Sequence, residues 1–232
     1  MGRLYDALLA AYGPQRWWPI EGPPETAAIE VCVGAILVQH ARWESAAAAL
    51  GTLRGADALS VHALATLPFD DLEALVRGAG TYRAKARTLR SFAEAVLAGP
   101  GGTIEGLLAG DADTVRRRCL GVWGVGPETA DAIVLYAAKR PTFVVDAYAR
   151  RLFARLGCEL PAGYEPARRA LLAVSDLDAG RLGEWHALIV AHGKARCRGR
   201  SPRCEGCPLI EDCPAGASRV QAHCSPVASR RD

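Results

Sequence analysis

The sequence predicts an all-α fold made of two helical domains. Half of the 232 residues are hydrophobic, which is enough for a sizeable core, and this length suits one large domain or two small ones. Alanine and leucine dominate and runs of β-branched residues are short, a composition that favours helices. Turns rich in glycine and proline separate the apolar stretches, which predicts a succession of short antiparallel helices.

In chain order, residues 1–25 begin with a short helix and continue into Trp17-Trp18-Pro19. Paired tryptophans among prolines usually pack as a lid on a core, and the alternative is a stacking wall for a base. From Thr26 an apolar helix runs to Gln39, and an alanine-rich helix follows Trp43. Further helices are expected over residues 57–66, 70–78, 82–98, 111–119, 127–136, 145–156, 165–174 and 181–192. Residues 215–232 lack an apolar period, and we expect them to be disordered.

A tight turn and a presented carboxylate stand out between residues 120 and 156. Glycine permits a positive φ and lets another backbone come close, and Gly124-Val125-Gly126 places two glycines in one turn. Pro127 suits the first position of a helix, whose positive end and free amides favour a phosphate. An extended segment, residues 142–145, then presents Asp146 at the start of another helix. Taken alone, these features also fit an ordinary helical turn and an N-cap aspartate.

Four cysteines close to one another predict a metal centre. Cys197, Cys204, Cys207 and Cys213 lie within seventeen residues, which in a cytosolic protein indicates metal binding and not a disulfide framework. Zinc ribbons use pairs of close cysteines, and only one pair is close here.

The turn, the aspartate about twenty residues later and the cysteine spacing together resemble the helix-hairpin-helix DNA glycosylases of the endonuclease III superfamily. The resemblance implies a six-helix barrel with a helix-hairpin-helix over residues 26–139. It implies a second domain, from residues 1–25 and 140–214, in which the four cysteines hold a [4Fe–4S] cluster. The cleft for double-stranded DNA lies between these two domains in that family.

The same resemblance assigns roles to individual residues. Asp146 matches the catalytic aspartate, which stabilises a cationic sugar after the damaged base has left the helix. Gln39 matches a glutamine that fills the gap left by the base, and Thr81 occupies the position of a residue that inserts into the duplex. Backbone contacts with DNA are expected from the hairpin and from a basic loop, at Gly124, Val125, Gly126, Arg198, Arg200 and Arg203.

Glu128 stands where members of the family with lyase activity have a lysine. A carboxylate cannot form the imine through which that lysine cleaves the strand. The chain has only three lysines, Lys85, Lys139 and Lys194, and Lys194 is the one expected near the cleft. The sequence therefore predicts a monofunctional glycosylase with weak or absent lyase activity.

Three features resemble one branch of the family, the endonuclease III-like 3-methyladenine DNA glycosylases. They are Trp17-Trp18-Pro19, Trp43 and the run from Gly126 to Asp131. In that branch the aromatic residues stack on an alkylated purine, whose positive charge favours an electron-rich indole. We therefore expect a base pocket formed by Trp17, Trp18, Trp43 and Lys194.

The predicted function is excision of damaged bases from DNA, alkylated purines first. The alternatives are an endonuclease III-like glycosylase for oxidised pyrimidines with lyase activity, a deaminated-mismatch glycosylase, and a DNA-binding protein that has lost catalysis. The net charge is only +3, but the cations are clustered, as five basic residues without an acid in 194–203 illustrate, which favours a polyanionic partner. No signal peptide or membrane-spanning run is recognisable, so we expect a cytoplasmic, nucleoid-associated monomer of bacterial type.

Overall fold

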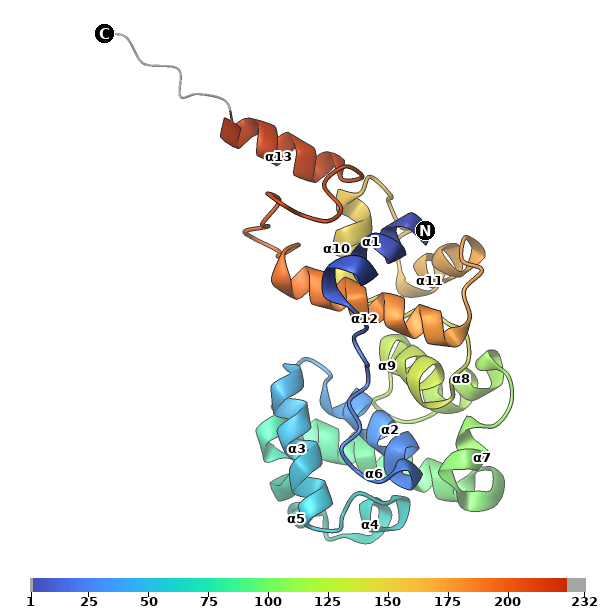
Figure 1. The fold of residues 1–232 in the computed structure, drawn as a ribbon. Coiled ribbons are helices and arrows are strands. Elements are labelled where there is room, and N and C mark those ends of the chain that lie inside the picture. The colour runs from blue at the N-terminus through green and yellow to red at the C-terminus, as the bar shows by residue number, and fades with distance from the viewer. Residues whose placement is uncertain (1, 225–232) are drawn as a thin grey trace. The chain divides into compact units, whose positions relative to one another are not determined.

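The computed structural model describes residues 2–224. This part of the chain consists of helices and loops without a β-strand, which confirms the all-α prediction (Figure 1). Its residues form two compact units. Residues 18–142 and 178–180 form the barrel unit, and residues 2–17, 143–177 and 181–224 form the cysteine unit. None of the helices in the described part is long and apolar enough to cross a membrane.

The barrel unit is a succession of short helices. Its α-helices are α2 (Ala27–Leu37), α3 (Trp43–Gly55), α4 (Val61–Thr66), α5 (Phe69–Leu75), α6 (Tyr82–Ala98), α7 (Ile104–Leu108), α8 (Ala112–Leu120) and α9 (Pro127–Ala132). Short 3₁₀ helices occur at Pro24–Thr26, Arg77–Ala79 and Pro100–Gly102, and α9 continues into a π-helical segment, η4 (Ile133–Ala137). Helix α7 was not predicted, and the Thr103 side chain caps it by accepting a hydrogen bond from the amide of Gly106 at 3.1 Å.

The core of the barrel unit surrounds α2. Every residue of this helix from Ile29 to Leu37 is buried, as its almost continuous apolar sequence predicts. It packs against α3 and α6 (Figure 1) and also against η4. Helix α6 is amphipathic and contributes Leu89, Phe92 and Val96 to the same core. This apolar packing supports the hairpin between α8 and α9, because Val122 and Val125 also belong to it.

The unit boundaries lie a few residues outside those predicted for the barrel, at 18–142 instead of 26–139. At the first boundary, the Trp18 ring packs against Trp43 and Tyr136 of this unit. At the second boundary, the Thr142 hydroxyl donates to Asp131 Oδ1 at 2.8 Å, and both residues are fully buried. Side-chain contacts of this kind are not visible in the family resemblance, which set the predicted limits.

The cysteine unit contains α1 (Gly2–Tyr12), α10 (Ala147–Arg155), α11 (Tyr164–Ala173), α12 (Ala179–Ala195) and α13 (Pro214–Cys224). From Arg181 onward, α12 forms its centre, with Trp185, Leu188 and Ile189 buried. The Tyr5 ring of α1 stacks on Trp185 with the centroids 5.8 Å apart. The unit thus joins chain segments that are far apart in the sequence.

Of residues 215–232, for which disorder was predicted, residues 215–224 belong to α13. Pro214 starts this helix, and the amide of Ala217 donates to the carbonyl of Cys213 at 2.9 Å. The amide of Gly216 also donates to the Cys213 sulfur at 3.3 Å, so the helix start is anchored on the cysteine segment. Residues 225–232 lie outside the described residues.

Candidate functional site

The hairpin between α8 and α9 requires glycine at one of its two glycine positions. Gly124 has a φ of +82°, and a Cβ on this residue would collide with the Thr88 side chain of α6. Gly126 has an extended backbone, with φ −88° and ψ 175°, and a Cβ there would meet no atom within 4 Å. The conformational reason predicted for both glycines therefore applies to Gly124, whereas Gly126 borders open space.

The start of α9 lacks a side-chain cap. The amide of Val125 is used within the turn, since it donates to the carbonyl of Val122 at 3.1 Å. Gly126 is the N-cap of α9 and offers no side chain to accept from the helix amides. The first amides of a helix have no intrahelical acceptor and carry the positive end of the helix dipole. An anion site at this helix start stays a prediction, and Val125 does not contribute a free amide to it.

Gln39 contacts the hairpin directly. Its Nε2 donates to the carbonyl of Gly124 at 3.0 Å and to the Thr129 hydroxyl at 2.9 Å. The residue predicted to fill the gap left by a base thus lies beside the predicted phosphate site, within the barrel unit. Thr81, the predicted wedge, is exposed at the N-cap of α6. The loop before Thr81 is fixed by the buried Lys85 ammonium, which donates to the carbonyl of Ala79. Burial lowers the pKa of Lys85.

Asp146 is the N-cap of α10 and lies in a largely buried place of the cysteine unit. Its Oδ1 accepts a hydrogen bond from the amide of Ala149 at 2.7 Å, and its Oδ2 lies 3.5 Å from His186 Nε2. Burial, the largest influence, raises the pKa of the Asp146 carboxyl, but the hydrogen bond and charge of His186 and the amides of Ala149 and Tyr148 outweigh it. The net pKa is below the usual value, so Asp146 is ionised at neutral pH.

Sequence reasoning missed His186 as a partner of Asp146. The residue belongs to α12, forty positions after the aspartate, and its side chain is only 9% exposed. A histidine within an apolar helix is usually interpreted as a core residue. The sequence around His186 does not distinguish it from one. Only the packing of α12 against the start of α10 identifies the pair.

The predicted aromatic pocket residues separate into two groups. Within the barrel unit, the Trp18 ring meets Trp43 edge to face at 5.2 Å between centroids. Within the cysteine unit, Lys194 Nζ lies 5.8 Å from the centroid of Trp17. Each pair is thus in contact inside its own unit.

Tyr136 is a further member of the aromatic group that the sequence analysis did not single out. Its ring lies 5.6 Å from Trp18 between centroids, and it belongs to the π-helical segment η4. Here the amide of Ala138 donates to the carbonyl of Ile133 at 3.0 Å, five residues earlier. The extra residue per turn rotates the side chains that follow, a device frequent at functional sites. Trp18, Trp43 and Tyr136 are all half-buried, and we call them the aromatic trio.

The four predicted metal-ligating cysteines line one cavity of the cysteine unit, of about 400 Å³ with part of it open to solvent. The Cys197 sulfur accepts a hydrogen bond from Arg155 at 3.2 Å, as Cys213 does from Gly216. Burial, the largest influence, raises the pKa of Cys207, and the charges of the three other cysteines add to this. His192 is buried behind Cys207, and burial together with Arg196 and Arg151 lowers its pKa to about 4. The cysteines therefore share one environment.

The four cysteines are candidate ligands of a metal centre. Within residues 2–224, no group of three or more histidine, cysteine, aspartate or glutamate side chains is close enough to hold one ion. A zinc ion binds each thiolate sulfur at about 2.3 Å, which would require the four sulfurs to meet at one point. In an iron–sulfur cluster each thiolate binds a different iron, so the sulfurs stand further apart around the cluster. Cys197, Cys204, Cys207 and Cys213 line one cavity and are the residues that would hold either group.

The basic loop after Cys197 is held by its backbone and exposes its side chains. Arg155 donates to the carbonyls of Arg198 and Gly199, at 2.8 and 2.9 Å. The amide of Arg203 donates to the carbonyl of Arg196 at 2.9 Å. Arg198, Arg200 and Arg203 all have exposed side chains, so the three predicted DNA-binding arginines are accessible within their unit.

The described part of the chain thus combines an all-helical fold with an uncapped hairpin helix, a buried ionised aspartate and a four-cysteine cavity. Residues 33–174 match the family described as HhH-GPD superfamily base excision DNA repair protein, and the chain belongs to this family. It is a DNA glycosylase of that family. Its resemblance to the endonuclease III superfamily is thereby confirmed.

Several known proteins are similar over most of their length. A Methanocaldococcus jannaschii protein named "Putative DNA repair glycosylase" is 38% identical over 214 residues, which cover 91% of this chain and 94% of the relative. Endonuclease III of Bacillus subtilis is 26% identical over 66% of each chain. The structure of H. pylori 3-methyladenine DNA glycosylase (MagIII) bound to 1,N6-ethenoadenine has a TM-score of 0.67 at 26% identity, covering 82% of this chain and 95% of that one. A trapped endonuclease III–DNA covalent intermediate shares the fold, with a TM-score of 0.74 at 20% identity over 93% and 95% of the two chains.

Proposed function

We propose that this glycosylase is monofunctional and removes alkylated purines from double-stranded DNA as a monomer. The observation that carries the proposal is the aromatic trio, together with a glutamate at the position of the lyase lysine. A relative of 26% identity, the H. pylori 3-methyladenine DNA glycosylase, binds 1,N6-ethenoadenine, a modified purine, and this supports the substrate class. A cytoplasmic, nucleoid-associated location is part of the same proposal, because the substrate is DNA.

In the proposed mechanism Asp146 acts on the sugar. Breaking an N-glycosidic bond gives the sugar oxocarbenium character, and an ionised carboxylate stabilises that positive charge. Asp146 is ionised, and the cap bond to Ala149 fixes the direction of its side chain. The second oxygen faces His186 at 3.5 Å, so the carboxylate keeps its charge although it is largely buried. His186 is a positioning residue in this scheme.

The aromatic trio would receive the flipped base. A purine alkylated at a ring nitrogen such as N3 or N7 carries a positive charge, so the faces of electron-rich aromatic rings bind it better than the neutral base. The same charge makes it a good leaving group, and no acid is needed to protonate it. Trp18, Trp43 and Tyr136 are half-buried residues, so the aromatic trio is not wholly enclosed in the core.

Glu128 excludes imine formation at its own position. It lies exposed in the first turn of α9, where the family pattern has the lyase lysine. A carboxylate has no amine to attack the sugar, so water adds to the sugar carbon as the base leaves, and the reaction ends with an abasic site in an intact strand. Lys194 is an exposed amine of the cysteine unit, and the proposal assigns it no covalent role.

The cysteine cavity would hold a [4Fe–4S] cluster through Cys197, Cys204, Cys207 and Cys213. When bound, the cluster supplies structural binding energy and performs no step of the base chemistry. Arg155 and the amide of Gly216 donate hydrogen bonds to two of the sulfurs, which suits thiolate ligands. The ordered loop would then present Arg198, Arg200 and Arg203 to the DNA backbone.

One assay tests the activity and its class together. Duplexes carrying methylated purines, oxidised pyrimidines or deaminated mismatches are incubated with the wild-type protein and with Asp146→Asn. We expect release of methylated purines by the wild type alone, no strand cleavage before alkali, and no covalent complex after borohydride. Release of oxidised pyrimidines with efficient borohydride trapping would instead establish an endonuclease III-like lyase. No release from any duplex by a folded protein would leave a DNA-binding protein without catalysis.

The cluster has a separate test. Purified protein should contain iron and sulfide and absorb broadly in the visible range, and Cys204→Ser should lose both iron and the folded state of the loop. Cys158→Ser is the matched control, because Cys158 is exposed and does not line the cavity. One zinc and no iron per chain in undamaged protein would contradict the proposal.

A further inference from the structure

A buried carboxylate and a glycine on one face of α2 hold the chain segment that carries Trp18. Glu30 and Gly34 are four residues apart, so they lie one above the other on the helix. The segment from Trp18 to Gly22 contacts both of them. All of these residues belong to the barrel unit, so the arrangement does not depend on the other unit.

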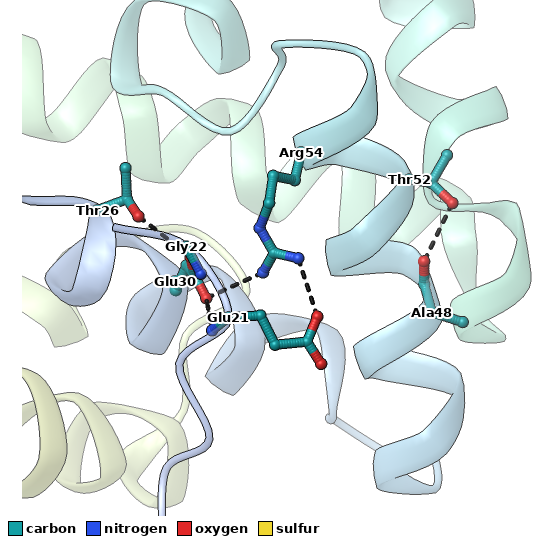
Figure 2. A network of polar contacts seen from close by, with 7 residues as sticks. All are labelled: Glu21, Gly22, Thr26, Glu30, Ala48, Thr52 and Arg54. Carbon is teal, nitrogen blue, oxygen red and sulfur yellow. Dashed lines mark hydrogen bonds and ion pairs between the residues drawn. The ribbon is translucent and has the colours of Figure 1, made fainter. Parts of the chain in front are cut away.

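Glu30 anchors one end of this segment. The residue is 1% exposed, and its Oε1 accepts from the amide of Gly22 at 2.8 Å and from the Thr26 hydroxyl at 3.1 Å (Figure 2). Its Oε2 accepts from the amide of Glu21 at 3.2 Å and from Arg54 at 3.0 Å. Four donors therefore surround one carboxylate, which compensates the cost of burying its charge.

Arg54 ties the same segment to a second helix. It comes from α3 and reaches Glu30 at 3.0 Å and Glu21 at 2.9 Å, so it bridges the helix carboxylate and the segment (Figure 2). Burial works against the charge of Arg54, but the hydrogen bonds and charges of Glu21 and Glu30 raise its pKa overall. The Glu30–Arg54 pair and its contacts are called the anchor below.

The other end of the segment carries Trp18, which lies directly on Gly34. A Cβ on Gly34 would stand 2.9 Å from Trp18 Nε1 and 3.0 Å from its Cζ2. Gly34 lies within α2 and its φ is not positive, so its lack of a side chain serves this close approach. The indole rests on the helix backbone and meets Trp43 and Tyr136 from there.

We infer that the anchor and Gly34 set the position of the Trp18 indole and thereby determine how well the enzyme excises alkylated purines. They are positioning residues, because they act through Trp18 and do not touch the base. The inference rests on the proposed function, in which Trp18 stacks on the flipped base. Displacement by about 1 Å of a group that orients the substrate can reduce a rate by about a hundredfold, so small displacements of the segment matter.

The test is a double-mutant cycle between Gly34→Ala and Trp18→Ala, read by single-turnover release of methylated purines. Gly34→Ala should slow release about tenfold or more, because the new methyl group displaces the indole. In the Trp18→Ala background the same substitution should have almost no effect, since the ring it displaces is gone. Near-ultraviolet circular dichroism should also change for Gly34→Ala, as the edge-to-face pair of Trp18 and Trp43 moves.

Matched controls separate positioning from a general loss of folding. Gly51→Ala is the same substitution within α3, where a Cβ would meet no atom within 4 Å, and it should leave release unchanged. Glu30→Gln should slow release less than Gly34→Ala in a folded protein, because the amide keeps an acceptor for the segment but weakens the Arg54 contact. Glu94→Gln, at an exposed position of α6, is its control.

The outcomes distinguish this inference from the proposed function. If Trp18→Ala leaves release of methylated purines unchanged, the proposed pocket is wrong. If Trp18→Ala slows release but Gly34→Ala does not, the pocket stands and the inference about Gly34 and the anchor is overturned. If Gly34→Ala slows release equally in both backgrounds, its effect is general, and the inference is overturned as well.

Discussion

Helices α9 and α10 start in opposite ways, although each has a carboxylate in or beside its first turn. At α10, the Asp146 side chain is the N-cap and accepts the amide of Ala149 at 2.7 Å. At α9, the N-cap is Gly126, which has no side chain, and Glu128 lies exposed in the first turn. At the start of α10 the Asp146 carboxylate accepts a hydrogen bond from a first-turn amide, whereas the start of α9 can accept an anion from outside.

The difference shows how one local element can serve two chemical tasks. A capping carboxylate is held in one direction and kept ionised, which suits the stabilisation of a cationic sugar. An uncapped helix start keeps its positive end available, which suits a phosphate of the DNA strand.

Asp146→Asn should lower the rate of base release by about 10²–10³-fold, the loss typical for removal of one preorganised electrostatic group. The asparagine oxygen can still accept the amide of Ala149, so thermal unfolding should change little. Asp146→Ala should lose the activity and, in addition, about 1 kcal/mol of stability from the missing cap. A wild-type release rate in Asp146→Asn would contradict the role assigned to α10.

The two hairpin glycines should respond differently to alanine. Gly124→Ala should destabilise the protein by about 2 kcal/mol, because a non-glycine residue is strained at φ +82° and its Cβ collides with Thr88. Gly126→Ala should change the free energy of unfolding by less than about 1 kcal/mol, because its backbone is extended and borders open space. Chemical denaturation measures both effects.

DNA affinity should respond to Gly126→Ala, the variant that is expected to keep its stability. Gly126→Ala places a methyl group where a strand would approach the start of α9, so its affinity for an abasic-site duplex should fall while its stability is kept. Equal affinity of Gly126→Ala and wild type would show that the strand does not come close to this residue.

The pH dependence of activity tests the pairing of Asp146 with His186. His186 lowers the pKa of Asp146, so His186→Gln should raise that pKa and move the acid limb of the release rate to higher pH. At a pH below the Asp146 pKa of both proteins, the release rate of His186→Gln should be about tenfold lower than that of the wild type for each pH unit that the limb moves. The stability that ionised Asp146 contributes is present above its unfolded pKa of about 3.9 and is lost as pH falls through the folded pKa. His186→Phe is a useful second variant, since it also removes the hydrogen bond.

The sequence predicted the helical fold because its signals are local. The apolar run that became α2 and the amphipathic pattern of α6 both indicate helices without knowledge of any neighbour. Helix α7 was missed because it is only five residues long, and its capping Thr103 is a weak signal by itself. Helix α13 was missed because its polar sequence has no apolar period, and it depends on the cysteine segment for its start.

The candidate site was predictable only where a motif fixes the residues. The cysteine spacing and the Gly-Val-Gly turn depend on positions close in sequence, and the structure gathers each set locally. The pairing of Asp146 with His186 and the place of Tyr136 beside Trp18 join distant segments. Such contacts follow from tertiary packing, which no single-sequence pattern records. The bond from Gln39 to the hairpin belongs to the same class, although the family resemblance had singled out the residue.

The smallest expected effect concerns Glu128, and it tests the division between the two helix starts most directly. A carboxylate in the first turn of a helix stabilises it by about 0.3–1 kcal/mol through the helix dipole, so Glu128→Gln should lower the free energy of unfolding slightly. If a DNA phosphate approaches the same helix start, the carboxylate repels it, and Glu128→Gln should bind an abasic-site duplex more tightly. Stability and affinity should therefore move in opposite directions, as chemical denaturation and equilibrium binding at fixed salt would measure. Asp113→Asn, in the first turn of α8, is the matched control, because that helix start is already capped by Asp111. A loss of affinity in Glu128→Gln would mean that the carboxylate helps DNA binding, and the start of α9 would then not be the anion site.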